Sequence, residues 1–189
     1  MRIISGKYKG HQLVSFKAEH VRPTTDRVKE TQFNILMGYT EAAQVLDLFC
    51  GTGNLGIEAL SRGAQKVVFV DSSKQSLDIT FKNIEKLKIP KEQCFIRNED
   101  VLKFLRNYSG DNFDLIFIDP PFTKKMAHEV MQALSESSVW GAQTLITIES
   151  ERKERLENEY GNLTRFDTRE FGDKILSFFS KKADNQGDE

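Results

Sequence analysis

A glycine-rich turn between an apolar strand and a helix restricts the fold of this chain more than any other feature. Val45–Phe49 is predicted to form a buried strand, and the segment Cys50-Gly51-Thr52-Gly53-Asn54-Leu55-Gly56 follows it and leads into a helix through Leu60. Glycines let such a turn pass close beneath a ligand, while the next helix points its amino end at the same place. The pattern predicts an α/β fold with a ligand crevice at the carboxyl ends of parallel strands.

Two carboxylates beside this turn narrow the choice of ligand. Asp71 follows the next predicted strand, Lys66–Val70, at the roughly 20-residue spacing at which dinucleotide folds place a carboxylate on ribose hydroxyls. Asp47 lies inside the first strand, where a buried carboxylate is costly unless it has a partner, and the ammonium group of a cofactor would be one. The glycines and Asp71 alone fit a nicotinamide cofactor as well as S-adenosylmethionine, and Asp47 favours the second.

Residues 113–122, Phe-Asp-Leu-Ile-Phe-Ile-Asp-Pro-Pro-Phe, place a short turn after a second buried strand, Leu115–Ile118. Prolines cannot extend a strand ladder, and each restricts the residue before it to extended geometry, so the turn is stiff. Its carboxylate and carbonyls could accept hydrogen bonds from a planar amino group while its aromatic ring stacks on the attached heterocycle. An ordinary proline turn with a solvated carboxylate is the alternative. The candidate catalytic residues are Asp119, Pro120, Pro121 and Phe122.

A third predicted strand, Cys94–Arg97, ends near another candidate contact. Asp100 could accept a hydrogen bond from an adenine amino group while the backbone N–H of Val101 meets a ring nitrogen. Asp100 is equally suited to cap the helix that follows it, and both roles could hold together. The helix before this strand ends at Pro90, and its apolar stripe is assigned to the core: Leu77, Phe81, Ile84 and Leu87.

The C-terminal part of the chain is predicted to complete the sheet. Thr123–Leu134 is expected to be helical, Gln143–Glu149 a strand and Glu151–Tyr160 a charged surface helix. Thr164–Glu170 and Lys174–Ser180 are then predicted to form a hairpin.

Composition bounds the class of protein. A chain of 189 residues with 39% hydrophobic residues and 14 Phe is long enough for one domain with a sizeable core. Its two cysteines and three histidines have no disulfide or metal-ligand spacing, so no metal is expected and a reducing cytoplasm is the predicted location. The start of the chain does not resemble a signal peptide, and there is no run of about 18 apolar residues, which predicts a soluble protein.

Charge is distributed unevenly along the chain, although the net charge is only −1. The first 30 residues carry seven basic and three acidic side chains, a local net charge of +4, and the remainder carries 20 basic and 25 acidic ones, or −5. A basic end on a mildly acidic body suits a local phosphate contact better than a general coating of nucleic acid. An ordinary solvated surface is the alternative.

The basic end contains two segments that could contact nucleic acid. Predicted strands at Arg2–Ser5 and His11–Phe16 flank a turn in which an aromatic ring between two lysines could stack on a base, although a plain surface hairpin fits the same residues. Further on, residues 24–26, Thr-Thr-Asp, could cap a helix whose start is free for a ligand or simply exposed. With one lysine beside the Asp119 turn, the candidate contacts are Lys7, Tyr8, Lys9, Arg22, Thr25, Arg27 and Lys124.

Taken together, these motifs resemble the RsmD family of bacterial ribosomal RNA guanine-N2 methyltransferases over nearly the whole chain. The Asp119 turn resembles the Asp/Asn-Pro-Pro-aromatic signature of amino-group methyltransferases that use S-adenosylmethionine. Cys50 and Thr52 stand where family members often have Ala and Ser, and Asn54 where they have a small residue, departures that leave the backbone geometry possible. The matching segments are residues 4–10 (Ile-Ser-Gly-Lys-Tyr-Lys-Gly), 22–30 (Arg-Pro-Thr-Thr-Asp-Arg-Val-Lys-Glu), 47–53, 55–64 and 119–122.

The resemblance implies a Rossmann-like class I methyltransferase fold, with a seven-stranded, mostly parallel sheet and a C-terminal antiparallel hairpin. It divides the chain into an RNA-binding N-terminal extension of hairpin and helix (residues 1–40), a methyltransferase core (residues 41–182) and a disordered acidic tail (residues 183–189). The implied cofactor is S-adenosylmethionine, with a site formed by Asp47, Phe49, Gly51, Thr52, Gly53, Asn54, Asp71, Ser72, Asp100 and Val101.

The implied activity is methylation of one guanine in small-subunit ribosomal RNA within an assembly particle. In the predicted mechanism, Asp119 and the carbonyl of Pro120 accept hydrogen bonds from the guanine amino group and Phe122 stacks on the base, so alignment supplies most of the acceleration. The guanine must be unpaired or swung out to reach the turn. Three alternatives remain: a nicotinamide oxidoreductase, an amino-group methyltransferase acting on other RNA, DNA adenine or a protein glutamine, and a non-catalytic RNA-binding assembly factor.

Overall fold

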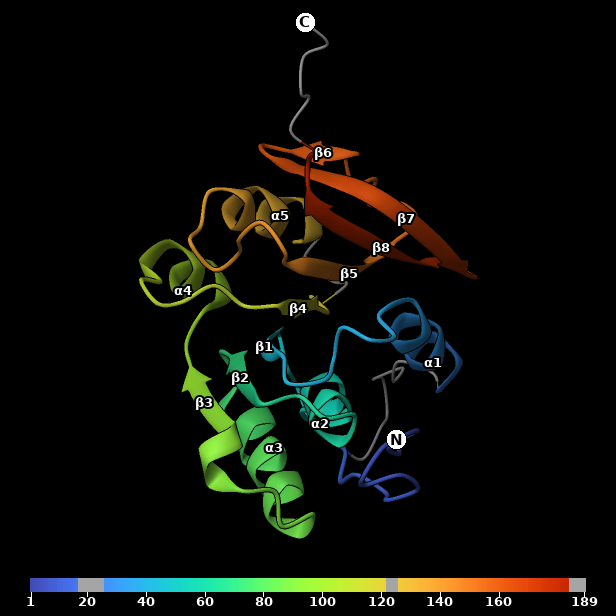
Figure 1. Ribbon diagram of the computed structural model, residues 1–189, viewed down its shortest axis with the longest axis vertical. Coiled ribbons are helices and arrows are strands. Elements are labelled where there is room, and N and C mark those ends of the chain that lie inside the picture. The colour runs from blue at the N-terminus through green and yellow to red at the C-terminus, as the bar shows by residue number, and fades with distance from the viewer. Residues whose placement is uncertain (17–25, 122–125, 184–189) are drawn as a thin grey trace, which may run out of the picture.

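A single eight-stranded sheet forms the centre of the computed structural model, which describes residues 1–16, 26–121 and 126–183 (Figure 1). The strand order is β3-β2-β1-β4-β5-β8-β7-β6. The first five strands along this order are parallel, and the last three pair in antiparallel fashion. The strands are β1 (Gln44–Leu48), β2 (Lys66–Asp71), β3 (Cys94–Asn98), β4 (Leu115–Ile118), β5 (Leu145–Glu151), β6 (Glu159–Tyr160), β7 (Leu163–Phe171) and β8 (Lys174–Lys181).

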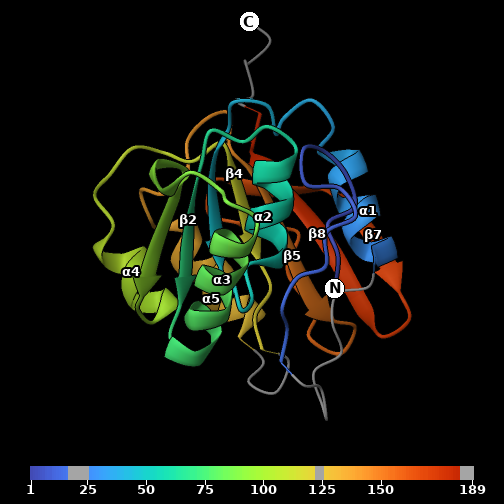
Figure 2. The same cartoon turned by 90° about the horizontal axis from the view of Figure 1, so that it is seen from below.

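Helices cover both faces of the sheet (Figures 1 and 2). Helices α1, α2 and α3 pack on one face and α4 and α5 on the other, and each group forms its own hydrophobic cluster with the sheet. A short 3₁₀ turn, Lys91–Gln93, precedes β3. No helix in these described residues is long and apolar enough to cross a membrane. The helices are α1 (Asp26–Ile35), α2 (Asn54–Ser61), α3 (Lys74–Lys86), α4 (Val101–Asn107) and α5 (Ala127–Ser135).

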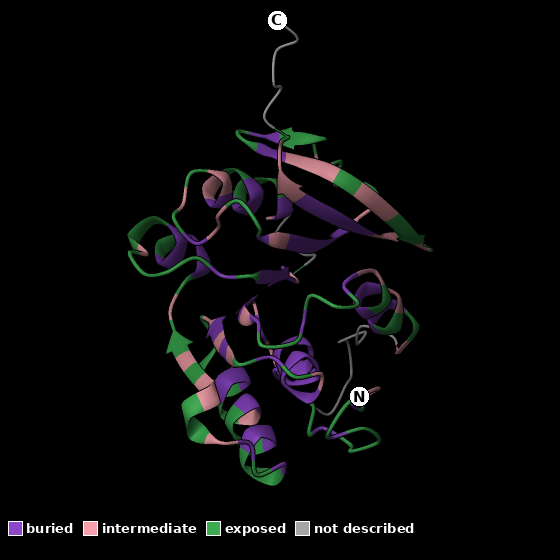
Figure 3. Cartoon of the chain, in the orientation of Figure 1, coloured by how far each residue is buried: buried purple, intermediate pink, exposed green. Residues whose placement is uncertain are grey.

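The central strands are buried on both faces because their side chains alternate between the two clusters. In β1, Val45 packs with the α1, α2 and α3 side, and Leu46 and Leu48 pack with the α4 and α5 side. All four residues of β4 and all eight of α2 are buried (Figure 3). This core confirms the predicted Rossmann-like α/β fold and fixes the strand ends that carry the candidate site.

The strand count and one helix differ from the sequence predictions. The sheet has eight strands instead of seven because the two-residue strand β6 pairs with the start of β7. The predicted charged helix over Glu151–Tyr160 was wrong: the segment leaves β5 as a turn and ends in β6. Long-range contacts decide this conformation, since Glu154 accepts a hydrogen bond from the backbone N–H of Ala127 at 2.7 Å and the Tyr160 side chain is only 2% exposed.

The N-terminal residues form a hairpin-like pair with a minimum of strand structure. Arg2 and Gln12 make a single antiparallel bridge, where two short strands were expected. The backbone N–H of Ile3 donates to the carbonyl of His11 at 3.0 Å, and that of Leu13 donates to the carbonyl of Met1 at 3.0 Å. Gly6 and Gly10, which both have positive φ angles, bound the turn between these segments, although regular pairing does not extend along both of them.

A buried ionic network joins this N-terminal segment to α1 and α2. Glu58 on α2 is fully buried, and its carboxylate accepts from the backbone N–H groups of Ile4 at 2.8 Å and Ser5 at 3.0 Å. Lys29 on α1, only 1% exposed, lies 3.0 Å from the same carboxylate. Burial lowers the pKa of Lys29, and the negative charge of Glu58 opposes that shift. Removal of Glu58 would take away the ion-pair partner of the buried Lys29, whereas without Lys29 the carboxylate of Glu58 would still pair with Arg62 at 2.8 Å.

Residues on both sides of position 40 thus share one core. The hydrophobic cluster that contains Val45 and Val67 also contains Ile3, Leu13 and Phe33. The described part of residues 1–40 is therefore packed onto the methyltransferase core, and its role in RNA binding stays a prediction. Most of the predicted acidic tail, residues 184–189, lies outside the described residues.

Candidate active site

The candidate crevice lies where the order of the strands reverses. β1 lies between β2 and β4, with Leu48 paired to Val70 on one side and to Ile118 on the other. The carboxyl ends of these three strands are therefore neighbours, which is where open α/β sheets bind ligands. The glycine turn after β1, Asp71 at the end of β2 and Asp119 after β4 are brought to the same edge, as the sequence predicted.

The glycine turn adopts a backbone conformation that few other residues tolerate. Gly51 and Gly53 have positive φ angles of 56° and 78°, and Phe49 has a φ of 58°. A residue other than glycine in this region costs on the order of 1–3 kcal/mol, so the surrounding structure must hold Phe49 there. Strain of this kind is concentrated at binding and catalytic sites. It marks the predicted cofactor turn as a constrained surface.

Polar side chains of α3 hold the glycine turn in place through hydrogen bonds to its carbonyl groups. The hydroxyl of Thr80 donates to the carbonyl of Gly51 at 2.8 Å, and the side-chain amide of Asn83 donates to the carbonyl of Thr52 at 3.0 Å. Asn83 also joins the N-terminal segment, since it donates to the carbonyl of Val14 at 3.0 Å and accepts from its N–H at 2.7 Å. Asn83 therefore connects the N-terminal segment directly to the turn that is predicted to hold the cofactor.

Gly56 allows α2 to lie against the sheet at very close range. A Cβ atom at this position would lie 2.4 Å from Cε1 of Phe69 and 2.8 Å from Cγ1 of Val67, both on β2. Its backbone N–H donates to Oδ2 of Asp47 at 2.8 Å. The glycine at this position therefore permits close packing of the helix on the sheet, and its N–H supplies a hydrogen bond to the buried Asp47.

Asp47 is a buried carboxyl group whose pKa is raised to about 8. Burial is the main cause, and the negative charges of Asp119 and Asp71 add to it, while the hydrogen bond from Gly56 acts in the opposite direction. The side chain is only 1% exposed. Three carboxyl groups thus come close together at this edge, and a cationic ligand is the partner that would favour their charged forms.

Asp71 links the glycine turn to the start of α3. Its Oδ2 atom accepts from the backbone N–H of Gly51 at 2.9 Å and its Oδ1 atom from that of Ser73 at 2.8 Å. Each carboxylate oxygen can accept a second hydrogen bond, so the predicted ribose contact stays open. Ser72, which lies between Asp71 and Ser73 in the sequence, is exposed.

Asp100 caps α4, which is the alternative role considered from the sequence. Its side chain accepts from the backbone N–H of Lys103 at 3.0 Å, and Val101 begins the helix. The cap places both residues beyond the end of β3, next to the end of β2. The cap uses one carboxylate oxygen, so the other could still accept a hydrogen bond from adenine. That contact stays a prediction.

The Asp119 turn is tied to the end of β1. The backbone N–H of Asp119 lies 3.4 Å from the carbonyl of Leu48, Pro120 is buried and Pro121 is exposed. Phe122 lies outside the described residues. The stiff turn predicted from the two prolines is thus next to the strand that leads into the glycine turn.

Three of the predicted RNA-contacting residues, Lys7, Tyr8 and Lys9, lie away from this crevice. Lys7 and Lys9 are exposed, but the backbone N–H of Lys7 donates to the carbonyl of Ser61 at 2.7 Å, at the far end of α2 from the glycine turn. An eight-residue helix places that end about 12 Å away. Tyr8 is 8% exposed and packs in the core, so little of its ring is available for stacking on a base.

The remaining predicted RNA contacts are only partly placed. Arg27 is exposed in the first turn of α1. Arg22, Thr25 and Lys124 lie outside the described residues. RNA binding by these side chains stays a prediction.

Several residues of the site have roles that the sequence reasoning missed. Asn54, predicted to contact the cofactor, accepts a hydrogen bond from the buried Lys29 at 2.9 Å and so belongs to the ionic network. Thr80 and Asn83 were overlooked because the apolar stripe of α3 was assigned to the core. A signal was present, since the polar residues Ser76, Thr80 and Asn83 share the buried side of that helix. Phe81, assigned to the core, is 44% exposed because it lies about 100° around the helix from Thr80.

In the part of the chain that the structure describes, no three His, Cys, Asp or Glu side chains are arranged to hold a metal ion. The two cysteines are free, and Cys50 is buried.

Together, the reversal of strand order at β1, the glycine turn and the antiparallel C-terminal hairpin define a Rossmann-like methyltransferase. A family model described as "Conserved hypothetical protein 95" matches residues 1–180. This chain therefore belongs to that family, which is the RsmD family that its motifs resemble.

Individual relatives agree with this assignment. The chain is 40% identical over 157 residues to Ribosomal RNA small subunit methyltransferase D of Haemophilus influenzae, covering 82% of this chain and 81% of the relative. It is 31% identical over 188 residues to the protein of the same name from Escherichia coli, covering 100% of this chain and 93% of the relative. The solved structure of the Escherichia coli protein yhhF superposes with a TM-score of 0.85 at 31% identity, covering 97% of this chain and 99% of that one.

Proposed function

We propose that this protein transfers a methyl group from S-adenosylmethionine to the exocyclic N2 of a guanine in small-subunit ribosomal RNA. The observation that carries the proposal is the meeting of the glycine turn and the Asp119 turn at the reversal point of the sheet, where the pairing of Leu48 with both Val70 and Ile118 holds their strands in register. Relatives named Ribosomal RNA small subunit methyltransferase D support the choice of substrate.

The residues at this edge fit S-adenosylmethionine. The cofactor carries a positive sulfonium and a positive ammonium group, and the crevice offers Asp47 with two further carboxyl groups near enough to raise its pKa. Gly51 and Gly53 have the backbone conformation that lets a ligand approach closely. When bound, the cofactor supplies an activated methyl group. In this proposal Asp47 accepts from the ammonium group and Asp71 from the ribose hydroxyls.

The remaining cofactor contacts in this proposal involve the adenine. Asp100 accepts from the adenine amino group and the N–H of Val101 meets a ring nitrogen, beside Ser72 at the end of β2. The α4 cap holds Asp100 in a fixed orientation, since its carboxylate accepts from Lys103. Positioning of this kind removes orientational freedom before the reaction, which is where most of the acceleration would arise.

The Asp119 turn acts on the guanine. Its carboxylate and the carbonyl of Pro120 accept hydrogen bonds from the exocyclic amino group, which aims the nitrogen lone pair at the methyl group, and Phe122 stacks on the base. Acceptors that are already in position cost no reorganisation as positive charge develops on the nitrogen. The guanine reaches the turn only when it is unpaired or swung out of its helix. We propose that residues 1–40 bind the RNA outside the crevice. In an assembly particle, the RNA on either side of the target guanine extends beyond the crevice.

Radiolabelled methyl transfer tests the proposal. The substrates are small-subunit particles and naked ribosomal RNA from a strain that lacks this gene, and the variant Asp119→Ala is the control. We expect label on guanine N2 with the wild-type protein and none with the variant. Label on another RNA base, on DNA or on protein would assign the same fold to another amino-group substrate, and no label on any of them despite cofactor binding would overturn the proposal.

A further inference from the structure

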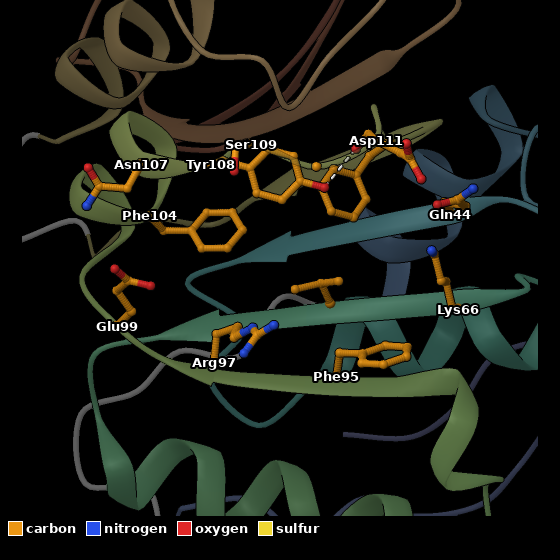
Figure 4. A pocket seen from close by; sticks show the side chains of 13 residues that line it. Gln44, Lys66, Phe95, Arg97, Glu99, Phe104, Asn107, Tyr108, Ser109 and Asp111 are labelled. Carbon is orange, nitrogen blue, oxygen red and sulfur yellow. Dashed lines mark hydrogen bonds between the residues drawn. The ribbon is translucent and has the colours of Figure 1, made fainter.

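A groove lies on the α4 face of the sheet, away from the glycine turn (Figure 4). It has a volume of about 520 Å³ and is formed by the edge strand β3, its neighbour β2 and the end of α4. Along β3, Cys94 and Ile96 pack with the cluster on the α3 side. Since alternate side chains of a strand point to opposite faces, Phe95 and Arg97 point into the groove.

The floor of the groove combines an aromatic ring with two cations. Phe95 is 43% exposed, and Figure 4 shows it between Arg97 and Lys66 along the two strands. Neither Arg97 nor Lys66 forms an ion pair with another described residue. The acidic lining residues Glu99 and Asp111 lie toward the two ends of the groove, so the floor itself carries positive charge only (Figure 4).

Aromatic side chains of α4 and of the residue directly after it form the opposite wall. Phe104 and Tyr108 line the groove, and their rings pack against each other with centroids 5.4 Å apart. The hydroxyl of Tyr108 donates to the carbonyl of Asp111 at 2.7 Å, which fixes the ring. The rings of this wall are therefore held in place before any ligand binds.

We propose that this groove binds a single-stranded segment of the RNA substrate, with one base stacked on Phe95 and the flanking phosphates contacted by Arg97 and Lys66. Unpaired cations beside an exposed aromatic ring are the combination that binds single strands without regard to sequence. The inference rests on the proposed function, because RNA is the substrate there. One end of the groove is at Glu99, directly before Asp100, so a strand that leaves the crevice can continue along this face.

Affinity for naked small-subunit ribosomal RNA tests the proposal, with Phe81→Ala as the matched control. Phe81 is 44% exposed on α3, so both variants remove an equally exposed ring from different faces. We expect Phe95→Ala to weaken binding about tenfold, as the loss of one stacked base does, and Phe81→Ala to leave it unchanged. Arg97→Ala should reduce the slope of log affinity against log salt by about 0.7, the value for one phosphate contact on a single strand.

Two substitutions at the same position distinguish stacking from general apolar contact. Phe95→Trp should retain the wild-type affinity because it keeps an aromatic face, and Phe95→Leu should bind as weakly as Phe95→Ala. Equal binding by Phe95→Leu and the wild type, or by Phe95→Ala and Phe81→Ala, would overturn the groove as an RNA site. An effect confined to intact particles would assign the groove to a protein partner and likewise overturn it.

The outcome is separable from that of the proposed function. If the wild-type protein methylates guanine N2 and the groove variants bind RNA normally, only the groove proposal fails. If the wild-type protein transfers no methyl group to RNA, the proposed function fails first, and binding of S-adenosylmethionine by every variant shows that each one is folded.

Discussion

The two sides of the candidate crevice are stabilised in different ways. The glycine turn is fixed by side chains of two other elements, since Asp71 of β2 and Thr80 and Asn83 of α3 all hydrogen-bond to its backbone. In the Asp119 turn, the backbone N–H of Asp119 lies 3.4 Å from the carbonyl of Leu48, and the two prolines stiffen the turn covalently.

Because of this difference, substitutions at the two turns should have different effects on stability and on catalysis. The side chains of Thr80 and Asn83 are buried and hydrogen-bond to the backbone of the glycine turn, so their substitution should lower the free energy of unfolding together with cofactor affinity. The two prolines restrict the Asp119 turn covalently, so substitution of the Asp119 side chain should affect the reaction more than the fold. Four substitutions test this contrast.

The largest effect is expected from Asp119→Ala. Loss of an acceptor aimed at the reacting amino group should lower kcat by at least about a hundredfold, by analogy with other preorganised polar groups. The melting temperature should not fall, and because the negative charge of Asp119 raises the pKa of Asp47, that pKa should decrease in the variant. Methyl-transfer kinetics and thermal unfolding of the same preparation measure both. A variant with lowered stability and unchanged kcat would contradict a catalytic role for Asp119 and indicate a structural one.

Gly56→Ala should have the largest effect on stability. In most helices this substitution is favourable, but here the new methyl group would meet Phe69 and Val67 at distances under 3.0 Å. Overpacking of this kind costs about 3 kcal/mol, measured by chemical denaturation. In a Phe69→Leu background the nearest ring atom is absent, so the two costs should not add. Additive costs would show that the close approach of α2 to β2 is not what excludes a side chain.

Asn83→Ala should have an intermediate effect on both properties. It leaves the carbonyls of Thr52 and Val14 and the N–H of Val14 without this partner, which costs about 2 kcal/mol of stability. The KM for S-adenosylmethionine should rise with little change in kcat, because the turn loses its support. Asn112→Ala is the matched control, since its amide also bridges two carbonyls, those of Ser138 and Trp140, on the other face. An equal change in KM for both variants would exclude a specific role for Asn83.

The sequence was sufficient for those parts of the site that depend on local backbone chemistry. Glycines at 51, 53 and 56 and the prolines after Asp119 restrict the backbone whatever surrounds them, so the strand–turn–helix unit and the stiff turn were both predicted. The alternation in residues 164–180 likewise predicted the hairpin of β7 and β8. The adjacency of Asp71 and Asp119 followed from the parallel sheet.

Features that depend on distant partners were not predictable in the same way. Residues 151–160 have the charges of a surface helix, but Glu154 caps α5 and the hydroxyl of Tyr160 lies 3.0 Å from Nδ1 of His128, and these contacts override local propensity. Lys29 and Glu58 are far apart in sequence, so nothing local showed that they are paired and buried. The position of the Lys7 turn at the far end of α2 follows only from its packing on Ser61.

The effect most specific to the glycine side is the pH dependence of Asp47→Asn. The folded wild-type protein retains a proton on Asp47 up to about pH 8, whereas the unfolded chain releases it near the ordinary carboxyl pKa. Between these two values the unfolded state binds fewer protons, so stability falls as pH rises, by at most about 1.4 kcal/mol per pH unit, and becomes constant above the folded-state pKa. Asparagine can still accept from Gly56 and does not titrate.

Chemical denaturation between pH 5 and pH 8 compares this variant with Asp114→Asn, which alters an exposed carboxylate that also accepts one backbone hydrogen bond, from Gln44. Asp47→Asn should lose the downward slope and become more stable than the wild type near pH 8, and Asp114→Asn should keep it. The gain should be accompanied by weaker binding of S-adenosylmethionine, because the ammonium group then has no carboxylate to meet. A variant that is more stable and binds the cofactor normally would show that Asp47 destabilises the fold and has no role in cofactor binding.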